Sequence, residues 1–277
     1  MRNSAIELLR ILMMLGIVAC HVIGQGGHDN HMGFDRIGGC GVVGFMFISG
    51  YFGMKCSLRR ALKLLGTALY CNFVVAGLGV WLNPEISYVQ YFLYNWTSGS
   101  GWWFLWGYLI VMLLAPLVEA AFLSEDGSCK RMGFVWPVLI LVFGWQFATA
   151  VPFLRRVIPS PDGLKGLSFA VLLGIYVFAR AFRLMRWDRY FPVRRSFAIL
   201  LVSSILVAMG FSQYSSPVAL LLGASSVSLA LSVTRLPEWV DKICTALVPS
   251  LFRYISFIRT FRGLKSSRVW KTILWVR

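Results

Sequence analysis

Long apolar segments, separated by short polar connections, make up most of this chain. Eight of them approach the roughly 18–20 residues that a helix needs to cross the apolar core of a membrane. They occupy residues 6–24, 37–54, 64–82, 102–122, 134–151, 167–182, 196–211 and 217–233, of which the sixth and seventh are short. The pattern predicts an all-α fold, a polytopic bundle of about eight transmembrane helices.

The composition supports this class. Of the 277 residues, 58% are hydrophobic and only 14% are charged, which is more apolar surface than a soluble domain needs. A net charge of +16 would suggest a nucleic-acid partner in a soluble protein. Here the basic residues cluster between apolar segments, so we expect membrane lipid and no nucleic acid as a partner. The six cysteines lack C-x-x-C spacing and predict small core residues, and no metal is expected.

The connections alternate in charge. The second and sixth connections hold most of the basic residues between segments: Lys55, Arg59, Arg60 and Lys63, then Arg183, Arg186, Arg189, Arg194 and Arg195. The first, third and seventh connections hold only Arg36 between them. By the positive-inside rule, the N-terminus is cytoplasmic. The fifth connection is also basic and breaks the pattern: either the predicted topology is wrong there or its charges meet an acidic ligand outside.

Two further stretches have a distinctive composition. Residues 38–53 contain six glycines, which predicts either close helix packing or a ligand that reaches the backbone, with packing favoured. Residues 83–101 are aromatic and nearly free of charge, which is typical of a re-entrant or interfacial helix on the outer side.

The first apolar segment contains three ionisable residues, Glu7, Arg10 and His21. Eleven residues advance a helix by about 16 Å and return it to nearly the same face, so Arg10 and His21 share one stripe at two depths. Glu7 is three residues from Arg10, within reach of an ion pair. Ionisable groups at such depth usually face the bundle interior and serve function. In the alternative interpretation, Arg10 snorkels to the near interface and His21 caps the far end.

A resemblance to a known family follows from four blocks in order. The spacing Arg10-x10-His21 starts in residues 6–12, which spell Ile-Glu-Leu-Leu-Arg-Ile-Leu, and residues 45–52 spell Phe-Met-Phe-Ile-Ser-Gly-Tyr-Phe. Residues 57–63 spell Ser-Leu-Arg-Arg-Ala-Leu-Lys, and Trp-Phe-Leu at 103–105 precedes Leu-Ala-Pro-Leu at 114–117. Together they resemble the integral-membrane acyltransferase family 3, bacterial enzymes that O-acylate cell-surface glycans. The likeness is strong up to about residue 120 and weak from there to about 240.

The resemblance implies an activity. Such an enzyme transfers an acyl group, usually acetyl from acetyl-CoA, to a hydroxyl of a cell-surface or lipid-linked glycan. It implies a multi-pass protein of the bacterial cytoplasmic (inner) membrane, with acyl-CoA and the glycan acceptor as partners. The family motif carries over His21 as the catalytic imidazole and Arg10 as its companion, and Glu7 joins them as the expected ion-pair partner. An imidazole suits general-base work, or it carries the acyl group briefly.

The expected acyl-donor site lies at the start of the third apolar segment. The family's paired basic residues correspond to Arg60 and Lys63, where this chain has Lys at a position that is more often Arg. Coenzyme A is a polyphosphate, and Arg59, Arg60 and Lys63 could supply the cations it needs. A positive-inside anchor explains the same cluster equally well.

The predicted domain organisation is an acyltransferase-like transmembrane domain over 1–240 and a basic tail over 241–277. The tail either lies on the anionic inner leaflet or is a shortened or altered C-terminus, in which case activity is in doubt. The alternative function is therefore a non-catalytic membrane protein, namely a transporter of glycan intermediates or an inactive truncated relative.

Overall fold

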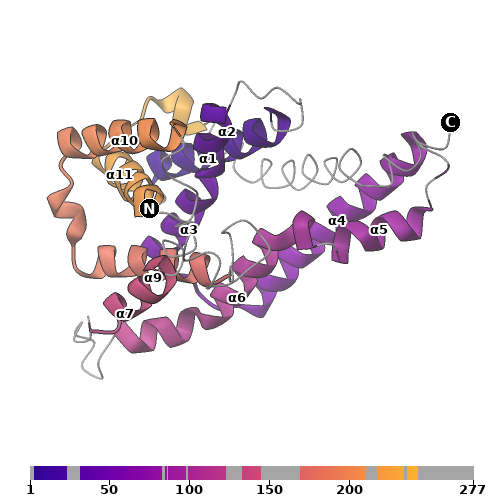
Figure 1. Cartoon of the computed structure of the whole chain (residues 1–277), viewed down its shortest axis with the longest axis horizontal. Coiled ribbons are helices and arrows are strands. Elements are labelled where there is room, and N and C mark those ends of the chain that lie inside the picture. The colour runs from indigo at the N-terminus through magenta and orange to yellow at the C-terminus, as the bar shows by residue number, and fades with distance from the viewer. Residues whose placement is uncertain are drawn as a thin grey trace, which may run out of the picture.

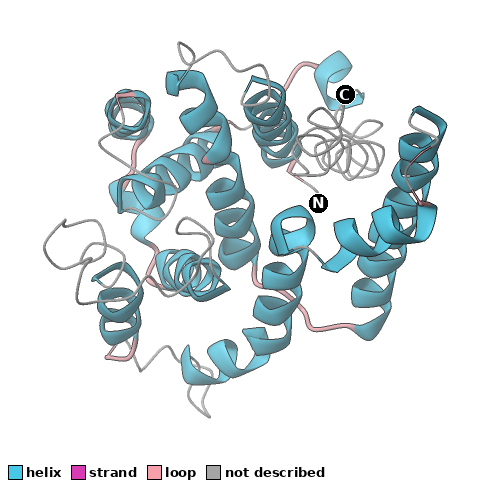
Figure 2. Ribbon diagram, turned by 45° about the vertical axis from the view of Figure 1, so that its right-hand side comes forward, coloured by secondary structure: helices cyan, strands magenta, loops and turns pink. Residues whose placement is uncertain are grey.

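The structure is a computed structural model, and it describes residues 3–23, 32–82, 85, 87–97, 99–122, 133–144, 169–209, 217–233 and 236–242. These residues form helices and no strand, as Figure 2 shows, so the all-α prediction is confirmed. The longer helices are α1 (Ser4–Ile23), α2 (Met32–Gly39), α3 (Gly41–Phe52), α4 (Leu58–Leu82), α5 (Tyr88–Thr97), α6 (Gly99–Phe122), α9 (Phe169–Leu184), α10 (Val193–Ala208) and α11 (Pro217–Ser232). The short α7 (Val135–Leu139) continues as a π-helical turn (Ile140–Gly144), and a 3-10 turn (Trp187–Tyr190) follows α9.

The helices follow the predicted apolar segments, with one division. The second segment, 37–54, is interrupted at Cys40, where α2 ends and α3 begins. Among the described residues, two stretches are long and apolar enough by themselves to cross a membrane, Leu58–Trp81 and Trp103–Phe122. Helix α3 has 12 residues and α11 has 16, which at about 1.5 Å per residue is shorter than the roughly 30 Å apolar core of a bilayer.

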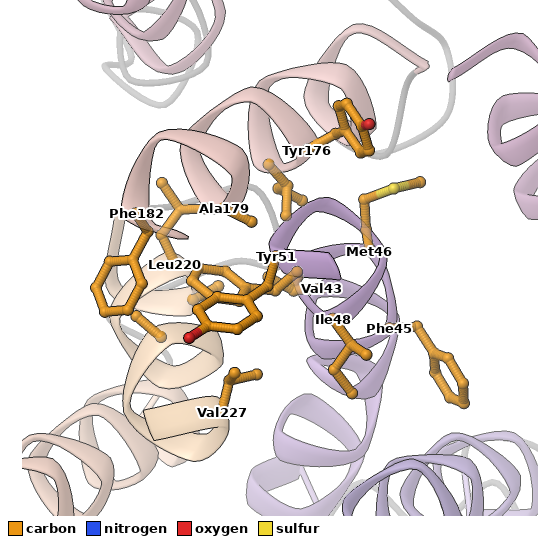
Figure 3. Close-up of a cluster of buried hydrophobic side chains, with 14 of the residues drawn as sticks. Val43, Phe45, Met46, Ile48, Tyr51, Tyr176, Ala179, Phe182, Leu220 and Val227 are labelled. Atoms are coloured by element: carbon orange, nitrogen blue, oxygen red, sulfur yellow. The ribbon is translucent and has the colours of Figure 1, made fainter. Parts of the chain in front are cut away.

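Helix α3 is the centre of the molecule. It lies between α9, α11 and α1 (Figure 1), and all but two of its twelve residues are buried. Its rings interlock with those of α9: Phe47 meets Phe182 edge-to-face, with 5.6 Å between ring centroids. Figure 3 shows Tyr51 and Phe182 side by side with Val227 of α11 nearby. The helix ends at Gly53, whose φ of 77° is one that L side chains rarely adopt.

Glycines bring the backbones of the central helices together. A Cβ atom at Gly41 would lie 2.6 Å from the carbonyl oxygen of Met13, and one at Gly50 would lie 2.6 Å from that of Tyr176. The favoured interpretation of the glycine-rich stretch, close packing, is therefore what the structure has. Because Gly44 contacts Met13 while Gly38 contacts Gly16, α1 runs antiparallel to the α2–α3 segment, and the start of α1 lies at the end of α3.

Helices α4, α5 and α6 extend away from this centre (Figure 1). Val75 and Ala76 of α4 pack against Tyr91 of α5. The buried residues of α4 begin at Ala68; none of residues 58–67 is buried. The predicted interfacial segment 83–101 accordingly contains a helix, α5, which packs along the second half of α4.

Apolar side chains also form stripes on the outside of the helices. Leu113 of α6 is 67% exposed and Phe197 of α10 is 59% exposed. Each belongs to a row of exposed residues three or four apart: Trp106, Ile110, Leu113 and Leu117 on α6, and Val193, Phe197, Leu201 and Ile205 on α10. Such spacing places each row on one face of its helix. Soluble proteins rarely expose rows of this kind on several helices.

Candidate functional site

The start of α1 is fixed by polar contacts. Asn3 caps the helix, because its Oδ1 accepts hydrogen bonds from the backbone N–H groups of Ala5 at 3.0 Å and Ile6 at 3.4 Å. The hydroxyl of Ser4 donates to the carboxylate of Asp241, in the segment that follows α11. A carboxylate at this position also complements the positive end of the helix dipole. The first turn, and with it Glu7, is thereby held in place.

Glu7 and Arg10 form the ion pair that their spacing predicts. Nη1 of Arg10 donates to Oε1 of Glu7 at 2.8 Å. Glu7 is only 5% exposed, so this charge lies inside the protein and the guanidinium compensates it. Leu12, which is more than half exposed, lies on the opposite side of the same helix. The pair therefore faces the interior of the bundle, away from the apolar outer surface.

The backbone of α1 continues through position 21. The side chain of His21 lies outside the described residues, so its role stays a prediction. By helix periodicity, position 21 falls within about 20° of position 10. Met14, which lies one turn after Arg10 on that face, is buried.

The predicted donor-binding residues Arg59, Arg60 and Lys63 are exposed on the first two turns of α4. Helix α4 follows α3 after the five-residue connection 53–57. Because α1 runs antiparallel to α3 with Met13 beside Gly41 and Gly44, Glu7 and Arg10 lie beside the second half of α3, toward the end from which this connection leaves. The two other histidines of the chain, His28 and His31, lie outside the described residues. Within those residues, no group of three or more His, Cys, Asp or Glu could hold a metal ion.

A second polar cluster, which the sequence interpretation missed, lies at that end. Arg180 of α9 donates to Oε2 of Glu119 in α6 from Nε at 2.9 Å and from Nη2 at 2.7 Å. The other oxygen of Glu119 accepts from the hydroxyl of Tyr176 at 3.2 Å. That hydroxyl in turn accepts from the backbone N–H of Met54 at 3.2 Å. We call these four residues the Glu119 network.

A neighbouring cluster also joins an arginine, a tyrosine hydroxyl and a carboxylate. Nη1 of Arg183 donates to the hydroxyl of Tyr51 at 2.9 Å, and the guanidinium carbon lies 5.0 Å from the centre of the Tyr51 ring. The same hydroxyl donates to Oδ2 of Asp188 at 3.3 Å.

Arg180 and Glu119 could have been singled out in the sequence, because both are ionisable residues inside predicted apolar segments, as Arg10 is.

Comparison with known families assigns the chain to one of them. A family model described as an acyltransferase domain matches residues 3–257. The chain belongs to the acyltransferase family 3. Neither the curated proteins nor the solved structures give a significant match.

The match covers every helix of this acyltransferase that the structure describes, from α1 to α11. It includes both predicted groups of site residues and both tyrosine clusters. It also extends past residue 240, into the first part of the segment predicted as a basic tail.

Proposed function

We propose that this acyltransferase is a multi-pass protein of the bacterial cytoplasmic membrane that transfers an acetyl group from acetyl-CoA to a hydroxyl of a cell-surface or lipid-linked glycan. The observation that carries the proposal is the Glu7–Arg10 ion pair, whose carboxylate is buried and lies on the side of α1 opposite the exposed Leu12. A buried ion pair in an otherwise apolar helix costs free energy to desolvate, which favours a functional role. The family membership supplies the chemistry, acyl transfer.

The membrane location is supported by the surface of the helices. The exposed rows on α6 and α10 match what lipid tails would cover, and the close glycine contacts of α1, α2 and α3 are typical of helices that pack within lipid. The eight predicted spans fit this view if the shorter helices cross together with their flanking residues. The exposed arginines of the connection between α9 and α10 lie at the same end of α3 as the basic start of α4, as the positive-inside rule expects of the cytoplasmic face.

The acyl donor then binds at that basic end. Arg59, Arg60 and Lys63 hold the phosphates of coenzyme A, and the pantetheine arm extends along α1 toward His21. The two ends of this path are about 16 Å apart along α1, from the level of Arg10 to that of His21. Arg10, fixed by Glu7, presents a guanidinium of defined direction to the donor.

The proposed reaction is a direct transfer. His21 removes the proton from the acceptor hydroxyl, whose oxygen attacks the thioester carbonyl carbon. A carbon–oxygen bond forms, the carbon–sulfur bond breaks, and the thiolate of coenzyme A leaves with the bonding electron pair. The imidazolium then gives its proton to the thiolate. The products are the glycan ester and coenzyme A, and His21 returns to its neutral state.

The test compares three histidine variants in membranes of the expressing bacterium. Membranes are incubated with radiolabelled acetyl-CoA, and label is counted in the extracted glycan. His21→Ala should lower incorporation by about 10²–10⁴-fold, the usual contribution of a general base, with unchanged protein in the membrane fraction. His28→Ala and His31→Ala are the matched controls and should retain activity. Full activity of His21→Ala would overturn the assignment of the base.

A further inference from the structure

The start of α4 is largely exposed. No residue of 58–67 is buried, and the packed part of α4 begins nearly three turns after the start of the helix, at Ala68, against α5 and α6. Arg59, Arg60 and Lys63 all lie in this stretch and are exposed. The five-residue connection 53–57 therefore ties this end of α4 to the central helices, while the packed second half of the same helix fixes its other end.

That connection is held at its second residue by the Glu119 network. Met54 packs against the central core and its backbone N–H donates to the hydroxyl of Tyr176. Tyr176 is fully buried, so its ring cannot swing away from this position. Glu119 orients the hydroxyl by accepting its hydrogen bond, and Arg180 fixes the carboxylate through two hydrogen bonds to the other oxygen.

The backbone before Met54 restricts the connection further. Gly53 has a φ of 77°, and its N–H donates to the carbonyl of Gly50 at 3.2 Å, which closes α3. A Cβ atom at Gly53 would lie 3.4 Å from both the guanidinium carbon of Arg180 and Oε1 of Glu119. The end of α3 thus packs directly against the Glu119–Arg180 ion pair.

From this arrangement we infer that Tyr176 and Glu119 are positioning residues for the acyl donor: they hold the 53–57 connection so that Arg59, Arg60 and Lys63 converge on the phosphates of coenzyme A. This inference rests on the proposed function. Tyr176 and Glu119 act through Met54 and the basic residues and do not touch the donor themselves. Their loss weakens donor binding and leaves the transfer step unchanged.

The kinetic experiment uses the full chain in native membranes with labelled acetyl-CoA. Tyr176→Phe keeps the buried ring and removes the hydroxyl, so the KM for acetyl-CoA should rise about fivefold with kcat within twofold. Glu119→Gln keeps an acceptor for Tyr176 and should give a smaller rise than Glu119→Ala. Tyr51→Phe is the matched control, because it removes a hydroxyl from the neighbouring cluster without touching Met54. An equal rise in KM for Tyr51→Phe, or a fall in kcat alone for Tyr176→Phe, would overturn the inference.

A second measurement does not depend on activity. Cys56 is exposed within the connection, whereas Cys20, Cys40 and Cys71 are buried. A nitroxide label at Cys56, in a background with Cys129 and Cys244 replaced by Ser, reports local mobility by electron paramagnetic resonance. Tyr176→Phe should increase this mobility and Tyr51→Phe should not. If Tyr176→Phe increases the mobility but the unchanged protein transfers no acetyl group at all, the Tyr176 hydroxyl does hold the connection and the proposed function is wrong. Unchanged mobility in Tyr176→Phe would defeat the inference, whatever the activity.

Discussion

Gly38 of α2 lies directly against Gly16 of α1: a Cβ atom at position 38 would be 2.3 Å from the carbonyl oxygen of Gly16. The same Cβ would lie 3.0 Å from the Cβ of Cys20. Position 16 is between Arg10 and His21 along α1, so this contact sets the distance between the rest of the bundle and the helix that carries the predicted catalytic residues. In lipid, where no hydrophobic force draws helices together, such close backbone contact is a principal source of association.

Gly38→Ala should therefore destabilise the protein. The clashing atom belongs to the backbone, so no side chain can rotate away and the two helices must separate. Overpacking of this kind costs about 1–3 kcal/mol. Thermal unfolding of the purified protein in detergent measures the loss. Gly66→Ala is the control, because a Cβ at Gly66 in α4 meets nothing within 4 Å and alanine favours a helix by about 0.5–1 kcal/mol. Equal melting temperatures for the two variants would contradict this account.

The Glu7–Arg10 pair predicts an asymmetric response to mutation. Arg10→Ala leaves a carboxylate that is 94% buried by side-chain area without its guanidinium, whereas Glu7→Gln leaves a guanidinium whose side chain is 30% exposed. Breaking a buried pair costs about 3–5 kcal/mol, and the partial exposure of Arg10 places this one toward or below the lower end. Arg10→Ala should thus lower the free energy of unfolding more than Glu7→Gln does.

The double variant Glu7→Gln/Arg10→Ala should recover part of this loss, because no charge then remains buried. A double-mutant cycle on unfolding free energies measures the coupling, which we expect at about 1–3 kcal/mol. Strictly additive losses would show that the two side chains do not stabilise one another.

Much of the fold follows from local pattern. An apolar segment of this length forms a helix wherever it lies, so the hydropathy of the sequence predicts α1 and α6 to within three residues. It also predicts the end of α4, but that helix begins at Leu58, six residues before the predicted segment. The break at Cys40 is different in kind. The segment 37–54 is continuous in hydropathy, and its division into α2 and α3 accompanies contacts with α1 that only the tertiary structure supplies.

The candidate site divides in the same way. Glu7 and Arg10 are three residues apart on one helix, so spacing alone predicts their ion pair. Glu119 and Arg180 are 61 residues apart, and nothing local shows that they meet. The rule that ionisable residues in apolar segments serve function would have selected both, but their pairing, and the role of the Tyr176 hydroxyl between Glu119 and Met54, required the packing of α3, α6 and α9.

The exposed apolar rows predict where lipid touches the protein. Leu113 lies near the middle of α6 and is 67% exposed. Leu113→Lys places a charge against lipid tails, at a cost of about 2.5–3.5 kcal/mol, and should lower the fraction of protein that resists carbonate extraction from membranes. Leu113→Phe keeps the surface apolar and should insert normally. In a soluble protein the lysine substitution would be harmless, so unchanged extraction of that variant would argue against lipid at this face.

The basic start of α4 has two explanations, donor binding and a positive-inside anchor. Only donor binding makes the effect of a mutation depend on whether the donor carries the phosphates of coenzyme A. S-acetyl-pantetheine carries the thioester without those phosphates. If Arg60 and Lys63 bind phosphate, Arg60→Gln/Lys63→Gln should raise the KM for acetyl-CoA by about tenfold or more, because charge-assisted hydrogen bonds contribute about 1.5–3 kcal/mol each. Its kinetics with S-acetyl-pantetheine should match those of the unchanged protein.

The matched control is Arg194→Gln/Arg195→Gln, which removes the same charge from the exposed start of α10, after the connection that follows α9. An anchor is indifferent to which basic connection is neutralised, since orientation depends on the summed charge of the cytoplasmic loops. If the cluster is only an anchor, both double variants should insert poorly. Each should then lose activity with acetyl-CoA and with S-acetyl-pantetheine to the same extent. Phosphate recognition instead confines the defect to one variant and one donor, because only α4 then contacts the coenzyme. A parallel loss would therefore remove Arg60 and Lys63 from the donor site and leave them as topology determinants.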